Sequence, residues 1–123
     1  MRLSAGLAIA ASVALGSPAL ADSCPLSQQG IAGDLSGPPA NENVSIDLVE
    51  SVDISAIDGL SGTVVLRRVT IAPGGIIRLH DHASVPGFAR LISGKALEHR
   101  SDCGTPIRRL PGDVATEHTH LTH

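Results

Sequence analysis

The stretch GTVVLRRVTIAPGGIIRLHDH, residues 62–82, decides the fold. Residues 63–71 consist mostly of Val, Ile, Leu and Thr, which favour strands. The run APGG at 72–75 is a turn signal, and residues 76–82 are typical of a second strand. We therefore expect this part of the chain to fold as short strands joined by turns.

The same pattern continues on both sides of this stretch. No window after residue 21 has the apolar period of an amphipathic helix. Short strands at regular spacing, separated by Gly and Pro turns, predict an all-β fold of the sandwich or barrel type. The further strands that we expect lie at 44–57 (one or two short strands), 88–93, 96–100 and 107–110.

Residues 1–21 predict a secretory signal peptide. A positive charge at Arg2 precedes an almost wholly apolar run at 3–15, and residues 19–21, Ala-Leu-Ala, carry small side chains where a signal peptidase cleaves. The apolar run is too short for a membrane-spanning helix, which needs about 20 apolar residues. We expect cleavage after Ala21, export to the periplasm or the medium, and no membrane span.

Cleavage would leave about 100 residues, which is enough for one domain. Residues 22–43 are rich in Ser, Gly, Pro, Asn and Gln and predict an N-terminal arm or leader before a domain at 44–123. Disulfides persist in exported proteins. We expect Cys24 and Cys103 to form one, the alternative being two unrelated thiols.

The composition argues against several classes of partner. The net charge of −3, with scattered arginines, provides no basic patch for nucleic acid or an anionic membrane. Phe88 is the only Phe, Tyr or Trp, so no aromatic platform can stack sugars or bases. Gly-rich phosphate loops and nucleophilic-serine motifs are absent from the sequence. A small-molecule ligand or substrate remains the expected partner.

Five of the six histidines fall in two clusters. His80 and His82 lie two residues apart on a predicted strand, so their side chains point to the same face and can chelate a metal. The alternative is a half-exposed strand with two solvated imidazoles. The second cluster, His118, His120 and His123, would lie opposite the first if a barrel closes.

The spacing around the first cluster resembles the cupin superfamily. The first motif of that family is Gly, five residues, His-x-His, three or four residues, Glu, six residues, Gly. Here Gly74, His80, His82, Gly87 and Gly94 follow that spacing. The departure is at position 87, where Gly replaces the metal-binding Glu of the family.

A second, weaker similarity lies near the C-terminus. The second motif of the family contains Gly, five residues and Pro-x-Gly, and Gly104 to Gly112 is similar, with Leu110 in place of the first proline. The resemblance covers 62–123 and implies a small β-barrel or jelly roll. It also implies closing strands beyond His123, so we expect the barrel to be incomplete at its C-terminal end.

The resemblance implies that His80, His82 and His123 hold a divalent transition metal inside the barrel. The residues do not distinguish Fe, Mn, Ni, Zn and Cu. With Gly at position 87, three histidines would leave coordination positions open for substrate and water. Glu98 and Glu117 are candidates for the absent carboxylate, although neither lies at the motif position.

Other polar residues have weaker assignments. Arg78 shares strand parity with the histidine pair and is a candidate for holding a substrate carboxylate, the alternative being a guanidinium that reaches water. Asp81 has the opposite parity and is expected on the surface. We expect Glu98 and Arg100 to pair on the outside of a hairpin. We expect His118 and His120 to lie beside the site or in solvent, and to be ligands only if the strand register differs from the motif alignment. We expect His99 at the surface.

Three functional hypotheses follow. The first is an exported small cupin-domain protein that binds a metal through histidines, with oxidoreductase (dioxygenase-like) or isomerase activity on a small molecule. The second is a non-enzymatic module that binds a small ligand or the metal itself. The third is a structural role without a metal. A homodimer formed through residues 44–57 is an additional expectation.

Overall fold

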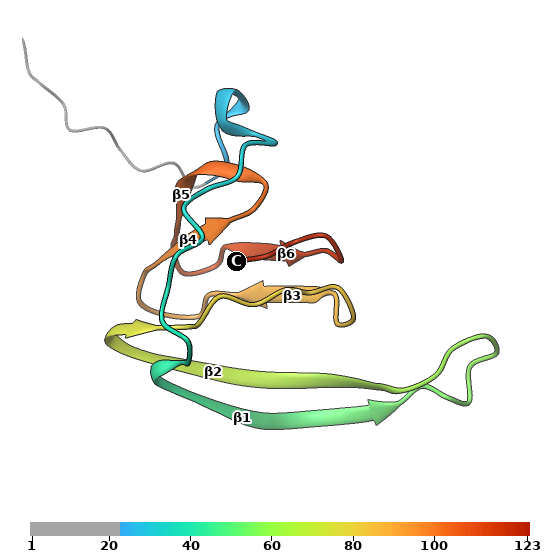
Figure 1. The fold of residues 1–123 in the computed structure, drawn as a ribbon. Helices are drawn as coiled ribbons and strands as arrows, with labels where there is room; N and C mark the ends of the chain where they lie inside the picture. Colours follow the sequence, from blue (N-terminus) through green and yellow to red (C-terminus); the bar gives the residue numbers. More distant parts are fainter. Residues whose placement is uncertain (1–22) are drawn as a thin grey trace, which may run out of the picture.

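The computed structural model describes residues 23–123, and the predicted signal peptide at 1–21 lies outside them. The described part is almost entirely β, as the sequence predicted. None of its helices has the length and apolar character that crossing a membrane requires. The elements (Figure 1) are a short 3-10 helix η1 (Leu26–Gln28) and the strands β1 (Glu42–Asp53), β2 (Thr63–Ile76), β3 (Gly87–Arg90), β4 (Ala96–Arg100), β5 (Cys103–Arg109) and β6 (Val114–Glu117).

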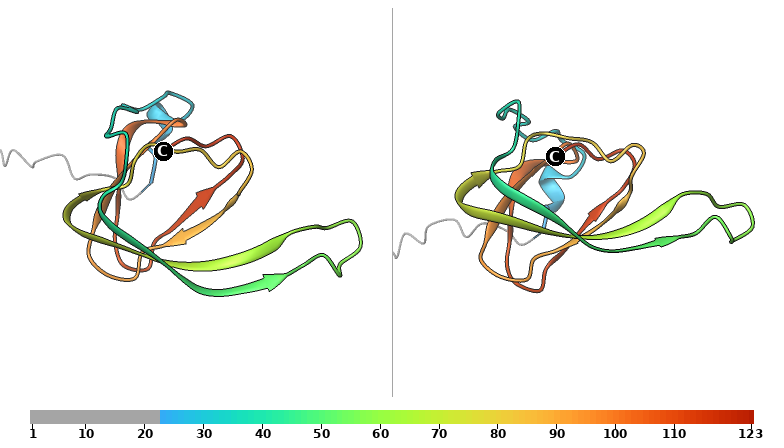
Figure 2. Two further views of the ribbon diagram at one scale, coloured as in Figure 1. Left: turned by 60° about the horizontal axis from the view of Figure 1, so that its bottom comes forward. Right: turned by 90° about the horizontal axis from the view of Figure 1, so that it is seen from below.

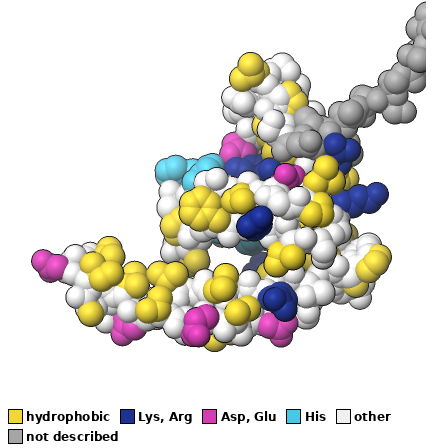
Figure 3. Space-filling view, turned by 180° about the vertical axis from the view of Figure 1, so that it is seen from behind, with side chains coloured by type: hydrophobic (Ala, Val, Ile, Leu, Met, Phe, Trp, Pro, Cys, Tyr) yellow, Lys and Arg dark blue, Asp and Glu magenta, His cyan; other side chains and the backbone are white. Residues whose placement is uncertain are grey.

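Strands β1 and β2 form a long antiparallel hairpin that projects from the rest of the molecule (Figure 2). Cross-strand pairs such as Ile46 with Val69 place β-branched side chains together on one face. Much of this apolar surface is exposed, including 63% of Leu48, and Figure 3 shows hydrophobic side chains spread over the hairpin. The homodimer expected through residues 44–57 stays a prediction.

The predicted turn at 72–75 is wrong, because these residues are part of β2. The pairing is irregular here: Glu42 lies opposite Ile76 and Val44 opposite Ile71, so β2 carries extra residues that bulge out of the ladder. Gly74, with φ of 77°, supports the bulge. The separate strand predicted at 76–82 is also not formed, since β2 ends at Ile76 and an extended segment follows.

The other four strands form two short pairs, of which β4–β5 is a hairpin and β3–β6 joins strands on either side of it in the chain. β3 pairs with β6 and β4 with β5, both antiparallel. The turn predicted at 101–106 is shorter than expected, because β5 already begins at Cys103. The fully apolar core of the described residues is small and lies around these strands. It consists of Cys103, Ile107, Ala115 and Leu121.

Strand pairing does not close the fold. Residues 23–123 contain three two-stranded sheets, β1–β2, β3–β6 and β4–β5, with no hydrogen-bonded ladder joining one sheet to the next. The all-β class is therefore confirmed, while the described residues form no closed barrel.

A buried arginine supplements the small apolar core. Arg100 is 7% exposed, and its guanidinium donates to Glu98 at 3.0 Å, to both carboxylate oxygens of Asp102 at 2.8 and 3.0 Å, and to the Thr116 carbonyl at 3.2 Å. The prediction of an outward-facing Glu98–Arg100 pair is wrong: the shared parity is right, but the pair faces inward. Burial is tolerated because the charge is paired and hydrogen-bonded.

The expected disulfide is present and attaches the N-terminal arm to the fold. Cys24 is bonded to Cys103 on β5. Gly30 then donates to the Asp102 carbonyl and Gly33 to the Arg100 carbonyl, both at 3.0 Å. The described part of the predicted arm thus contacts the β4–β5 turn between Cys24 and Gly33.

Replacing Cys24 by Ser should lower the free energy of unfolding by about 4 kcal/mol in the chain-entropy model, because the bridge joins residues 79 positions apart. Urea denaturation of the wild type and the variant under non-reducing conditions measures the difference. A reductant should destabilise the wild type and leave the variant unchanged. Equal urea midpoints for the two oxidised proteins would contradict the prediction.

Acid should weaken the Arg100–Asp102 contact. Hydrogen bonds from Arg100 hold the pKa of Asp102 below its ordinary value of 3.8, although burial opposes them. Because this pKa is lower in the folded state, its contribution to stability is complete above the ordinary value and is lost as the pH falls below it. Thermal unfolding of Asp102→Asn should therefore show a shallower loss of Tm between about pH 5 and pH 2 than the wild type. Parallel curves would refute this.

Candidate metal centre

A short antiparallel pairing builds the histidine cluster. His80 and His123 exchange two backbone hydrogen bonds of 3.0 Å, and His82 donates to the Leu121 carbonyl, also at 3.0 Å. Asp81 bridges Thr122 between them. Directly opposed residues project to the same face of such a pair, as do residues two positions apart. Residues from two distant parts of the chain therefore present their imidazoles on one side.

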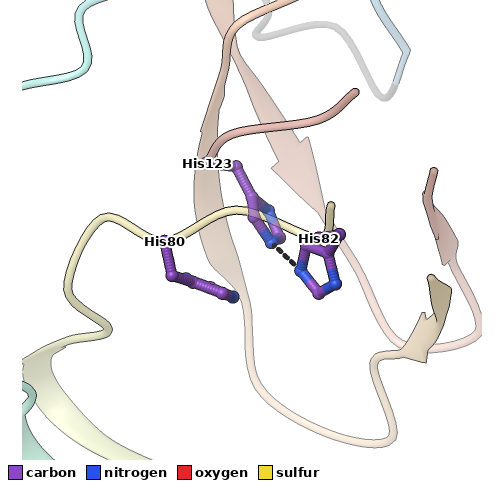
Figure 4. A group of neighbouring side chains, drawn as sticks. All are labelled: His80, His82 and His123. Atoms are coloured by element: carbon purple, nitrogen blue, oxygen red, sulfur yellow. Dashed lines mark hydrogen bonds between the residues drawn. The ribbon is translucent and has the colours of Figure 1, made fainter. Parts of the chain in front are cut away.

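The three imidazoles form a nearly equilateral triangle (Figure 4). The ring centroids of His80 and His123 are 4.6 Å apart, and each lies 5.0 Å from that of His82. One ring nitrogen from each residue lies within 4.8 Å of the others, close enough to hold a single metal ion. The side chains of His82 and His123 are only 11% and 13% exposed. The three histidines named from the sequence are thus brought together.

Hydrogen bonds fix the tautomer of all three rings. Nδ1 of His80 contacts the Arg78 carbonyl at 3.0 Å, and Nδ1 of His82 contacts the Val85 carbonyl at 2.9 Å. A carbonyl oxygen only accepts, so each Nδ1 carries the proton. Nδ1 of His123 donates in the same way to Glu98 at 2.9 Å. In the neutral rings every Nε2 is left as an unprotonated acceptor, which is the form that binds metals.

The 3.0 Å contact between Nε2 of His82 and Nε2 of His123 consequently joins two lone pairs. Two acceptors at this distance repel unless they share a proton or a metal cation. For His80, burial lowers the pKa below its ordinary value of 6.5, outweighing a hydrogen bond to Arg78 that acts in the other direction. A lowered pKa keeps that imidazole neutral and available to a metal at neutral pH.

Glu98 supports His123 from behind. One of its oxygens accepts from His123 and from Arg100, and the other accepts from Arg109 at 2.7 Å. Burial raises the pKa of Glu98, but the hydrogen bonds from His123 and Arg109 outweigh it and hold the pKa at about 2. The residue therefore stays ionised and keeps the His123 ring in place, as carboxylates behind metal-bound histidines do.

Glu117, the other candidate carboxylate, also lies beside the cluster. Its Oε2 is 3.7 Å from Nδ1 of His82, and its Oε1 is 4.0 Å from Nε2 of His123. The sequence supplied both glutamates as candidates but gave no means of assigning their positions. No sequence pattern predicts that the carbonyls of Val85 and Arg78 set the histidine tautomers.

The remaining candidates lie outside the triangle. The side chain of His118 is 44% exposed and contacts Asp102 at 3.1 Å, while His99 and His120 are exposed. Asp81 is exposed, as expected, and accepts from its neighbour Ala83.

Arg78 reaches the cluster through its backbone. Its carbonyl accepts from His80 and its N–H donates to Asn41, while the residue itself is exposed. Its binding of a substrate carboxylate stays a prediction.

Two hollows in the described part of the chain lie apart from the three histidines. A hollow of about 460 Å³ is lined by residues that include Cys24, Arg100 and Asp102, and one of about 250 Å³ lies on β1 and β2. Neither is lined by a residue of the triangle.

Comparisons with protein-family models, with curated proteins and with solved structures found no match to this chain.

Replacing Glu98 by Gln should lower the free energy of unfolding by about 3 kcal/mol, because two guanidinium groups and an imidazole lose a shared buried negative charge. Urea denaturation measures the loss. The matched control is Glu50→Gln on the exposed surface of β1, which should change stability by less than about 0.5 kcal/mol. Similar urea midpoints for the two variants would contradict the assigned role.

Proposed function

We propose that this chain is an exported protein that binds one divalent transition metal ion through Nε2 of His80, His82 and His123. The observation that carries the proposal is the common tautomer. All three Nδ1 atoms contact oxygen acceptors, which leaves each Nε2 unprotonated, and one ring nitrogen from each residue lies within 4.8 Å of the others. A cation removes the repulsion among these acceptors, and imidazole is a good ligand for Fe, Ni, Cu and Zn.

The finer proposal concerns chemistry at the bound metal. Three nitrogen ligands leave positions open, and a metal in such a site acts as a Lewis acid or as a place for oxygen to bind. We propose an oxidoreductase of the dioxygenase type, or an isomerase, acting on a small molecule. Glu98 would keep the imidazole of His123 oriented, and the side chain of Arg78 would be available to a substrate carboxylate.

Membership of the cupin superfamily is part of the same proposal. It is supported by the spacing of Gly74, the histidine pair and Gly94 and by the all-β fold. Export to the periplasm or the medium is supported by the pattern of residues 1–21 and by the Cys24–Cys103 bridge, since disulfides persist in oxidising compartments.

The non-enzymatic alternative has one observation in its favour. The two hollows of about 460 and 250 Å³ are not lined by the histidine triangle, whereas enzymes usually enclose their substrates in a pocket. A module that binds or carries the metal itself needs only the ligands. Oxygen uptake by the metal-loaded protein, measured with candidate small molecules, separates the two functions.

The test is the metal content of the full chain, exported during expression and purified without a histidine tag. Plasma mass spectrometry should find about one transition metal ion per chain in the wild type and almost none in His80→Ala/His82→Ala. The matched control is His99→Ala/His120→Ala, which removes two exposed histidines and should retain the metal. A folded wild type that neither contains nor takes up a divalent metal would refute the proposal.

A further inference from the structure

Glu117 is the least satisfied enclosed charge beside the histidine triangle. Its side chain is 17% exposed. Within residues 23–123 its nearest positively chargeable atoms are the imidazole nitrogens at 3.7 and 4.0 Å, both beyond hydrogen-bond length. No fully buried side-chain oxygen of the described residues lacks a partner, so the Glu117 carboxylate still reaches water, and a cation at the triangle would take the place of that water.

Glu98 provides the contrast. It is enclosed to a similar extent, 10% exposed, but both of its oxygens accept short hydrogen bonds. It contacts the protonated Nδ1 side of His123, whereas Glu117 approaches the unprotonated Nε2 side of the same ring. Two carboxylates therefore flank the imidazole of His123, and Glu117 is the one on its Nε2 side, although its other oxygen lies 3.7 Å from the protonated Nδ1 of His82.

The distance fits a shared ion. Two ligand atoms that are each about 2.1 Å from one ion lie at most about 4.2 Å apart. Oε1 of Glu117 and Nε2 of His123 are 4.0 Å apart, and the Nε2 atoms of His82 and His123 are 3.0 Å apart. Both separations lie within that limit. Among the described residues only the three histidines have ligand atoms that all lie within 4.8 Å of one another, so the Glu117 side chain must turn toward the ion to bind it, without a change of strand register.

Gly87 provides the room for this carboxylate. It lies directly opposite Glu117 in the β3–β6 pair, so both positions project to the same face. A Cβ atom at position 87 would lie 3.4 Å from Oε2 of Glu117. The carboxylate thus occupies the space beside the bare Gly87 backbone, and a longer side chain at 87 would compete for that space.

We propose that Glu117 supplies a carboxylate oxygen as a fourth protein ligand to the ion held by His80, His82 and His123. The inference rests on the proposed function. It gives the site three neutral nitrogens and one anionic oxygen, which lowers the net charge of a bound divalent ion from +2 to +1. Mixed nitrogen and oxygen ligation suits divalent Mn, Fe and Co as well as Zn, and disfavours Cu(I), which prefers sulfur.

Co²⁺ tests the ligand set, because its visible absorption responds to the number and type of ligands. Glu117→Gln should weaken Co²⁺ binding by about tenfold or more in competition with a chelator, and should change the absorption spectrum of the bound ion. Glu50→Gln, the same change on the exposed face of β1, should alter neither the affinity nor the spectrum. Circular dichroism verifies that each variant is folded.

A swap across the strand pair provides the second variant. Glu117→Gly should lose affinity, and Gly87→Glu/Glu117→Gly should regain most of it, because the two positions face the same space. Recovery of both affinity and spectrum supports a ligand role, since a purely structural glutamate would not be rescued from the opposite strand.

The two proposals fail in different ways. If wild type and His80→Ala/His82→Ala bind Co²⁺ equally, or neither binds it, the three-histidine site itself is refuted. If the wild type binds Co²⁺ through the histidines while Glu117→Gln has unchanged affinity and an unchanged spectrum, only the fourth ligand is refuted. The same conclusion follows if the swapped variant binds no better than Glu117→Gly.

Discussion

The backbone pairing of His80 with His123 is the constraint on which the candidate site depends. Two reciprocal hydrogen bonds join segments that are more than 40 residues apart and set their register. A slip of one residue would turn the His123 side chain to the opposite face. The same pairing positions Leu121, which is fully buried, so burial of an apolar side chain and assembly of the triangle favour the same register. Packing thus helps to hold the three ligands together.

Buried polar contacts are prominent in this small structure, which has few buried apolar residues. The buried apolar residues of the described part are few, whereas Arg100 alone connects β4, the following turn and β6 through its guanidinium. The same network continues through Glu98 to the ring of His123. Because buried charges are stable only when fully paired, a change at one member is felt at the others. The network that stabilises the β4–β5 pair is therefore also the network that orients the imidazole of His123.

Sequence patterns were informative where a local rule applied. The β-branched content of 63–71 predicted a strand, and i, i+2 spacing predicted that His80 and His82 share a face, although they lie just beyond β2. The prediction of a turn at 72–75 was wrong because Pro and Gly also accommodate a bulge inside a continuous hairpin. The shared strand parity of Glu98 and Arg100 predicted that they pair. It could not predict which face of the strand is buried, because that depends on residues far away in the chain. The carbonyls that set the histidine tautomers have no sequence signal.

The departure from the first cupin motif at position 87 can be related to the pairing of β3 with β6. The spacing of the first motif is intact there, but the carboxylate is absent from β3 and present at the paired position on β6. In an antiparallel pair, directly opposed positions face the same space, so a side chain can be lost on one strand and supplied by the other while the site keeps its composition. A sequence motif shows that the side chain is absent from the first strand, but it does not show that the second strand supplies one. If Glu117 is the proposed fourth ligand, a site judged degenerate from spacing alone would contain its full set of groups, and the strand register would be the observation that locates the missing one.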